Sequence, residues 1–183
     1  MPEKNRKLKL WELKRDSVEE FKKKEKFPII VVLDDIRSLN NVGTFFRTCD
    51  AFNIEKLILC GITGQPPHRE IQKTAIGATE SMNWSYAKSS LDVVTDLKKQ
   101  GFMINSVEQT ENSLFINEVD LSDVNQKSQV IVFGNEVDGV NQEVIDISDR
   151  VLEIPQFGTK HSLNVSICAG IIIWEFVNEL ISK

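Results

Sequence analysis

Three groups of polar residues in this sequence could do chemistry, and each group follows a predicted buried strand. Asn41 and Arg47 follow the first strand, and Glu136 follows a later one. Ser162 and Asn164 follow the last strand. The carboxyl ends of parallel strands form the edge of an α/β sheet where such folds bind their ligands. The sequence therefore predicts that a guanidinium, a carboxylate, a hydroxyl and two amides converge on one site.

The usual signatures of other ligand sites are missing from the sequence. No G-x-x-x-x-G-K-[ST] loop occurs, no G-x-G-x-x-G follows a strand, and no G-x-S-x-G is present. The two histidines, His68 and His161, have no paired cysteines near them, so we expect no metal site. These omissions disfavour triphosphate hydrolysis, dinucleotide binding and serine-hydrolase chemistry.

Strands and helices alternate along the predicted chain, with uninterrupted β-branched runs that are typical of strands buried on both faces. The alternation predicts a mostly parallel α/β sheet with helices on both faces. The predicted strands are residues 29–33, 56–60, 84–87, 102–107, 129–133 and 151–154. The predicted helices are residues 17–26, 41–52, 68–75, 89–100, 141–147 and 163–181.

Helix starts are predicted from capping residues. Ser17 opens a capping box, and Asn40 or Asn41 is the expected cap of the helix after the first strand. Ser162 is the expected cap of the last helix. That choice places Asn164 in the first helical turn, where free backbone N–H groups face outward.

Charge is distributed unevenly along the 183 residues, whose net charge is −5. Residues 1–26 carry ten Lys and Arg against six Asp and Glu, a balance of +4, and the remainder carries 12 against 21, a balance of −9. A basic arm could meet a polyanion, although charge alone favours a solvated charged helix.

Length and hydropathy favour a single soluble domain. With 41% hydrophobic residues the chain can bury a core, and no apolar run reaches the length of a membrane span. The Lys-rich start has no signal-peptide core. We therefore expect a cytoplasmic protein, with no membrane partner, in which Cys49, Cys60 and Cys168 stay reduced.

At the polar groups the sequence resembles the SpoU-type (TrmH-like) RNA methyltransferases of the SPOUT superfamily. Residues 41–51 resemble the motif N-x-x-x-x-x-R-[ST], and residues 132–140 resemble F-G-x-E-x-x-G. Residues 154–166 resemble I-P-x-x-G-x-x-x-S-L-N-V-S. The motifs occur in the family's order and spacing, and the resemblance runs from about residue 28 to the C-terminus.

The resemblance implies a SPOUT fold, with a deep trefoil knot in its C-terminal part, that works as a homodimer. It implies an S-adenosyl-L-methionine-dependent enzyme that methylates a ribose 2′-hydroxyl in RNA. On this basis residues 1–27 are a basic N-terminal helical extension and residues 28–183 a SPOUT methyltransferase domain. Because the added arm is short, we expect tRNA rather than rRNA as the RNA partner.

The resemblance also implies a role for each catalytic candidate. Arg47 is either the proton acceptor or a charged group that stabilises the developing alkoxide, and a guanidinium is almost always protonated. Asn41, Ser162 and Asn164 orient Arg47 and the ribose. Glu136 anchors its loop and positions Arg47 or the RNA.

Further implied roles concern the methyl donor, which Gly134, Ile154 and Leu163 contact largely through backbone groups.

Two other functions remain open: a base-methylating enzyme of the same superfamily, and a non-catalytic RNA-binding protein that kept the knot. A purely structural alternative for Arg47 is an ion pair with Asp50 or Glu136.

Overall fold

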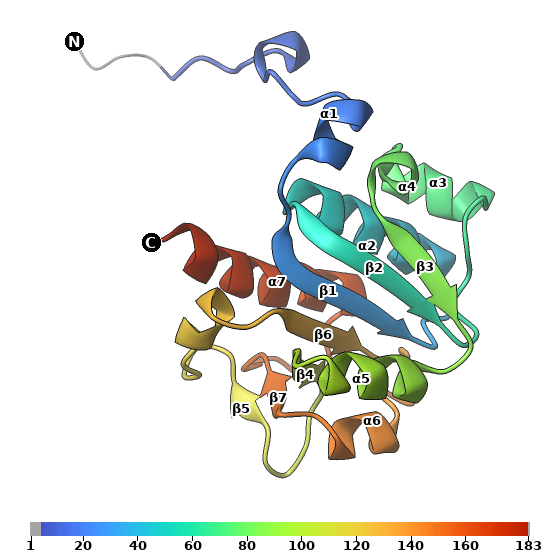
Figure 1. Ribbon diagram of the computed structural model, residues 1–183, viewed down its shortest axis with the longest axis vertical. Coiled ribbons are helices and arrows are strands. Elements are labelled where there is room, and N and C mark those ends of the chain that lie inside the picture. Colours follow the sequence, from blue (N-terminus) through green and yellow to red (C-terminus); the bar gives the residue numbers. More distant parts are fainter. Residues whose placement is uncertain (1–4, 183) are drawn as a thin grey trace.

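The computed structural model describes residues 5–182, and within them seven parallel strands form one sheet (Figure 1). In chain order the strands are β1 (Phe27–Asp34), β2 (Ile54–Cys60), β3 (Trp84–Ala87), β4 (Met103–Val107), β5 (Leu114–Phe115), β6 (Gln129–Phe133) and β7 (Arg150–Glu153). Across the sheet their order is β3-β2-β1-β6-β4-β7-β5. The predicted α/β class with a parallel sheet is confirmed.

The central strands β1 and β6 account for the strongest hydrophobic runs. Val31 of β1 pairs with Leu57 of β2 on one side and with Ile131 of β6 on the other. Successive side chains point to opposite faces of a sheet. Val31 and Val32 therefore enter two different hydrophobic clusters, one on each face, which explains why no polar residue interrupts the run.

Helices cover both faces of the sheet. Helices α2, α3, α4 and α7 pack on one face and α5 and α6 on the other (Figure 1). The α-helices are α1 (Val18–Lys23), α2 (Leu39–Ala51), α3 (Arg69–Ala75), α4 (Ala78–Ser81), α5 (Ser90–Lys99), α6 (Gln142–Asp146) and α7 (Val165–Ile181). Two 3-10 turns are η1 (Leu10–Glu12) and η2 (Ser122–Asn125).

Two of the predicted helix caps are wrong. Helix α2 is capped by Ser38, whose hydroxyl accepts the Asn41 N–H at 3.3 Å, and not by Asn40 or Asn41. Helix α7 is capped by Asn164, whose side-chain oxygen accepts the Ser166 N–H at 2.9 Å, and not by Ser162. Each stretch holds several residues able to cap, and tertiary contacts of the preceding loops decide which one does so.

The capping box that opens α1 is confirmed. The Ser17 hydroxyl accepts the Glu20 N–H, and the Glu20 carboxylate accepts the Ser17 N–H at 2.8 Å. Helix α4 and the short strand β5 were not predicted, because each has too few residues to carry a period. In residues 5–182 no helix is both long and apolar enough to cross a bilayer.

Candidate active site

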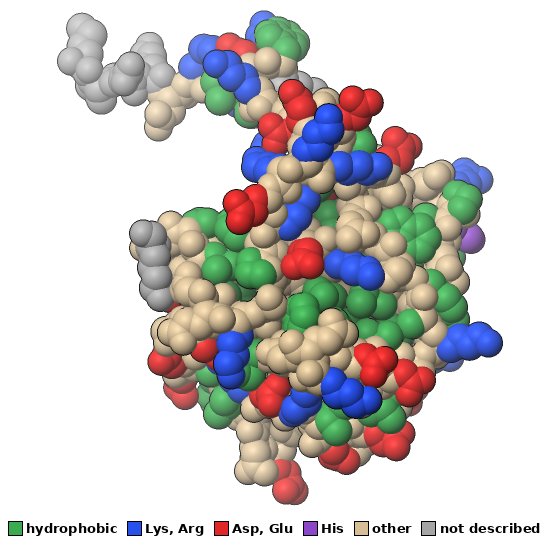
Figure 2. All heavy atoms as spheres, in the orientation of Figure 1, with side chains coloured by type: hydrophobic (Ala, Val, Ile, Leu, Met, Phe, Trp, Pro, Cys, Tyr) green, Lys and Arg blue, Asp and Glu red, His purple; other side chains and the backbone are tan. Residues whose placement is uncertain are grey.

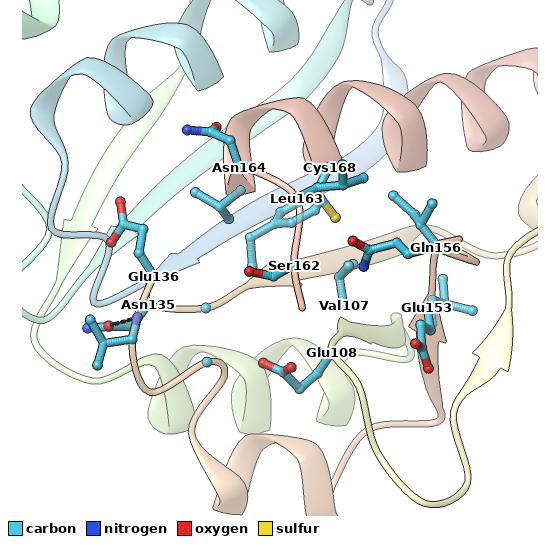
Figure 3. A pocket seen from close by; sticks show the side chains of 17 residues that line it. Val107, Glu108, Asn135, Glu136, Glu153, Gln156, Ser162, Leu163, Asn164 and Cys168 are labelled. Carbon is cyan, nitrogen blue, oxygen red and sulfur yellow. Dashed lines mark hydrogen bonds between the residues drawn. The ribbon is translucent and has the colours of Figure 1, made fainter. Parts of the chain in front are cut away.

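A pocket of about 420 Å³ opens at the carboxyl ends of β4, β6 and β7, beside the start of α7 (Figure 3). This volume lies within the range of small-ligand and cofactor sites in proteins. Its walls come from segments far apart in the sequence, including Val107 at the end of β4, Phe133 at the end of β6 and Val165 at the start of α7. The position is the one that parallel sheets offer to ligands.

The three residues predicted to contact a donor, Gly134, Ile154 and Leu163, all line this pocket. Gly134 has a further structural reason to lack a side chain. A Cβ on Gly134 would lie 2.1 Å from the carbonyl carbon of Gly139. Asn135 and Gly139 pair here as an isolated β-bridge, so only glycine lets the loop turn this tightly against the pocket.

Glu136 ties the loop after β6 to the start of α2. Its carboxylate accepts the backbone N–H of Arg37 at 2.9 Å and of Ser38 at 3.1 Å, and also accepts the Asn41 side-chain amide at 2.9 Å. Partial burial raises the pKa of Glu136, but the hydrogen bonds from Arg37, Asn41 and Ser38 outweigh it, and the pKa falls below its ordinary value. The carboxylate is therefore held ionised at a helix start, where the backbone dipole also favours negative charge.

Asn41 links this carboxylate to the third motif. The Asn164 side-chain amide donates to the Asn41 Oδ1 at 3.2 Å, while Asn41 donates to Glu136. Glu136, Ser162 and Asn164 also line the pocket. The structure thus brings together four of the five predicted catalytic residues.

Arg47 is the exception among the predicted site residues. It lies on α2, six residues or roughly 9 Å of helix rise beyond Asn41, and it does not line the pocket. Its side chain is exposed, and among residues 5–182 no ion pair joins it to Asp50 or Glu136. Asp50 instead accepts the Ser81 hydroxyl. The guanidinium is available to a partner from outside the described chain.

Sequence reasoning missed five polar residues of the pocket: Glu108, Asn135, Glu153, Gln156 and Cys168. Glu108 comes directly after a predicted strand, which is the signal that identified the other groups, so it could have been found. The Asn135 side-chain Oδ1 accepts a hydrogen bond from the Val137 backbone N–H at 2.8 Å and thereby shapes the loop. Gln156 lies at a variable position of the third motif, and Cys168 lies in the apolar run of the last helix. Neither pattern gives a reason to single the residue out.

The Cys168 thiol faces this pocket from α7. Burial and, secondarily, the charge of Glu108 raise the pKa of Cys168 to about 12. The thiol is therefore protonated at neutral pH and acts as a weakly polar wall. In the part of the chain described, no three His, Cys, Asp or Glu side chains are placed to hold a metal ion.

The parallel sheet, the pocket at its strand ends and the hydrogen-bonded polar groups together define a small-ligand site of an α/β fold. The model of the SpoU rRNA Methylase family matches residues 28–174, which is most of the chain. This chain belongs to that family.

Similar proteins include a tRNA (guanosine(18)-2′-O)-methyltransferase of Aquifex aeolicus, 32% identical over 153 residues that make up 80% of this chain and 67% of that protein. The crystal structure of the A. aeolicus TrmH/SpoU tRNA modifying enzyme has a TM-score of 0.79 at 27% identity, covering 91% of this chain and 83% of that chain. The crystal structure of an AdoMet-bound rRNA methyltransferase from Sinorhizobium meliloti has a TM-score of 0.76 at 26% identity. The match covers 88% of this chain and 60% of that chain.

Proposed function

We propose that this protein transfers a methyl group from S-adenosyl-L-methionine to a ribose 2′-hydroxyl of tRNA. The observation that carries the proposal is that the second and third motifs line one pocket and that Asn41 of the first motif is joined to both by its hydrogen bonds with Glu136 and Asn164. The relatives named above act on tRNA or rRNA by their names, and one of the solved structures holds AdoMet.

The donor, when bound, supplies a methyl group activated by a sulfonium. Gly134, Ile154 and Leu163 would hold it through backbone groups and apolar contact, since they line the pocket and carry no charge. An in-line displacement requires the attacking oxygen near the methyl carbon and the loss of a proton from that oxygen. The pocket residues of this chain would meet the first requirement by fixing the orientation of the donor.

The polar groups of the site would act on the ribose. Ser162 and Asn164 lie at the pocket wall and can orient the 2′-hydroxyl, while Glu136 and Asn41 hold the α2 loop in place. Arg47 has no partner among the described residues. It either accepts the 2′-hydroxyl proton or stays charged and stabilises the developing alkoxide.

The knot and the homodimer are part of the same proposal. Helix α7 packs on the sheet face that also carries residues of the β4–β6 connection, such as Val124 of η2. That arrangement supports a C-terminal segment passing through a loop of the chain. On its outer side α7 exposes Ile167, Ile171 and Trp174 at 56%, 36% and 43%. Their helical spacing gives an apolar stripe suited to a second copy.

We further propose that residues 1–27 form a basic extension and residues 28–183 the catalytic domain, in a cytoplasmic protein. The family model begins at residue 28, which supports this boundary. Figure 2 shows Lys and Arg side chains on the arm and on α1 with Asp and Glu among them, and both signs over the remainder of that face. The arm still carries an excess of positive charge, since residues 1–26 have ten Lys and Arg against six Asp and Glu. A tRNA would find phosphate contacts on the extension.

The proposal is tested by incubating the protein with methyl-labelled S-adenosyl-L-methionine and bulk tRNA or rRNA, followed by alkaline hydrolysis. A 2′-O-methyl group blocks cleavage at its own linkage, so we expect label in alkali-resistant dinucleotides from tRNA. Label in mononucleotides would instead identify a base-methylating enzyme. An absence of label together with RNA binding would identify a non-catalytic RNA-binding protein.

A further inference from the structure

We propose that Glu108 makes the donor pocket selective for charge, so that it favours a positively charged methyl donor over a product whose sulfur is uncharged. The inference rests on the proposed function and deepens it. Glu108 belongs to none of the three motifs, and it reaches the site from the end of β4. It would be a specificity-determining residue rather than a catalytic one.

The Glu108 carboxylate is held in place by backbone groups on both sides. One oxygen accepts the Gln109 N–H at 2.8 Å, and the other accepts the Val140 N–H at 3.1 Å. A Cβ on Gly139 would lie 2.1 Å from that second oxygen, so the glycine leaves room for the carboxylate. An ionised carboxylate offers about four acceptor positions, so these two bonds leave it able to interact with a ligand.

All the charged side chains that line the pocket are acidic. Its lining includes Glu108, Glu136 and Glu153 and, among the described residues, no Lys, Arg or His. None of the three carboxylates forms an ion pair within residues 5–182. A pocket with uncompensated negative charge stabilises a cation inside it.

Glu108 differs from Glu136 and Glu153 because its charge acts on a group on the opposite side of the pocket. Glu136 is bound to the α2 start, and Glu153 accepts the Gln109 side-chain amide at 3.0 Å and the Ser113 hydroxyl at 2.6 Å. The charge of Glu108 acts on the Cys168 thiol of α7. Figure 3 shows the Glu108 carboxylate on one side of the pocket and Leu163 and Cys168 on the other. Its field therefore extends across the space that a ligand would fill.

The proposed reaction changes the charge of the ligand in this space. The bond between the sulfonium sulfur and the methyl carbon breaks, and its electron pair stays on sulfur. A bond forms between the methyl carbon and the 2′-oxygen, whose proton passes to a base, either Arg47 or a water molecule. The donor carries one more positive charge than the product. A fixed negative charge at Glu108 therefore weakens binding of the product relative to the donor and favours exchange after each turnover.

The decisive measurement is the affinity of S-adenosyl-L-methionine and of S-adenosyl-L-homocysteine for the full chain by calorimetry. Wild type should bind the charged donor more tightly than the product. Glu108→Gln keeps an acceptor oxygen of similar size, and we expect it to weaken donor binding about tenfold while product binding changes less than about twofold. Glu143→Gln, which removes the same charge from exposed α6 outside the pocket, is the matched control and should keep the wild-type ratio.

If the ratio of donor affinity to product affinity is the same in wild type and in Glu108→Gln, the inference is overturned. An equal loss of donor affinity in Glu143→Gln would overturn it as well. If wild type binds neither ligand, the donor site itself is wrong and the proposed function falls too. If Glu108→Gln does not fold, the salt dependence of the wild-type ratio decides. Selection by charge must weaken as ionic strength rises, and a ratio independent of salt would contradict it.

Discussion

The donor pocket and the outer face of α2 adjoin each other but hold their polar groups in opposite ways. Beside the pocket, Asn41 bonds to Glu136 at 2.9 Å and receives the Asn164 amide at 3.2 Å. Arg47, further along α2, is exposed and has no ion pair in residues 5–182. The difference indicates that the pocket is preorganised for a small molecule, whereas we expect Arg47 to obtain its partner from bound RNA.

The N-terminal arm lies at the end of the sheet opposite to the pocket. It joins β1 at Phe27, whereas the pocket opens at the opposite, carboxyl ends of the strands. The eight residues of β1 span roughly 26 Å. An RNA in contact with both the arm and the pocket of one molecule must therefore follow the length of the sheet.

The largest expected effect is that of Arg47→Ala on catalysis. We expect methyl transfer to fall by about 10²–10⁴-fold, because a group that acts on the proton or the alkoxide is lost. Donor affinity should stay the same, since Arg47 does not line the pocket. Arg47→Lys should not restore the rate, because an ammonium lacks the planar fork of the guanidinium.

Single-turnover kinetics and calorimetry on the same Arg47 preparations check both halves of this prediction. Arg69→Ala on neighbouring α3 is the control for loss of an exposed positive charge. A rate within a few-fold of wild type for Arg47→Ala would remove Arg47 from the catalytic groups.

Deleting residues 1–16 should weaken RNA binding about tenfold at low salt and flatten its dependence on log salt. The segment carries six Lys and Arg against three Asp and Glu, a balance of +3. The deletion keeps the Ser17 cap and leaves the bond from Lys26 Nζ to Asn53 Oδ1 at 2.9 Å. Donor affinity and melting temperature should therefore be unchanged. An unaltered salt slope with a lowered melting temperature would assign the arm to packing instead.

Glu136→Gln tests whether the anchor holds the pocket together. We expect a loss of about 1 kcal/mol of unfolding free energy, allowing for partial exposure, because one amide oxygen replaces two carboxylate oxygens that accept three N–H groups. The pKa of Glu136 is lowered in the folded state. Its contribution is thus complete above the ordinary carboxyl pKa and disappears as pH falls through the lowered value.

Melting curves of wild type and Glu136→Gln across the acidic range measure that difference directly. The gap between the two melting temperatures should be widest near neutral pH and should close in acid. A gap that is constant with pH would show that the charge of Glu136 contributes nothing to stability.

The smallest effects distinguish the true cap of α7 from its neighbour in the motif. Asn164→Ala should cost about 1 kcal/mol of stability, because the Ser166 N–H loses its partner. Ser162→Ala should change stability by less than about 0.5 kcal/mol and yet slow methyl transfer, since Ser162 lines the pocket and does not cap the helix. Equal destabilisation by the two variants, measured by urea unfolding, would contradict this division of roles.

Local pattern was enough to predict the sheet and the ends of the strands at which the pocket opens. The runs at β1 and β6 are strands buried on both faces, and such runs are typical of a parallel sheet that helices cover on both faces. These features depend on residues close in sequence, or on the general rule that strand ends share an edge. Gly134, Ile154 and Leu163, which line one pocket, were identified only through the resemblance to the SpoU-type family.

Tertiary structure alone decided how the polar groups are paired. Ser38 rather than Asn40 or Asn41 caps α2 in a loop whose Arg37 and Ser38 N–H groups are held by Glu136, 99 and 98 residues away in the chain. The same contacts leave Arg47 without a partner. A hydrogen bond requires two groups within about 3 Å, and the sequence carries no measure of distance between residues so far apart.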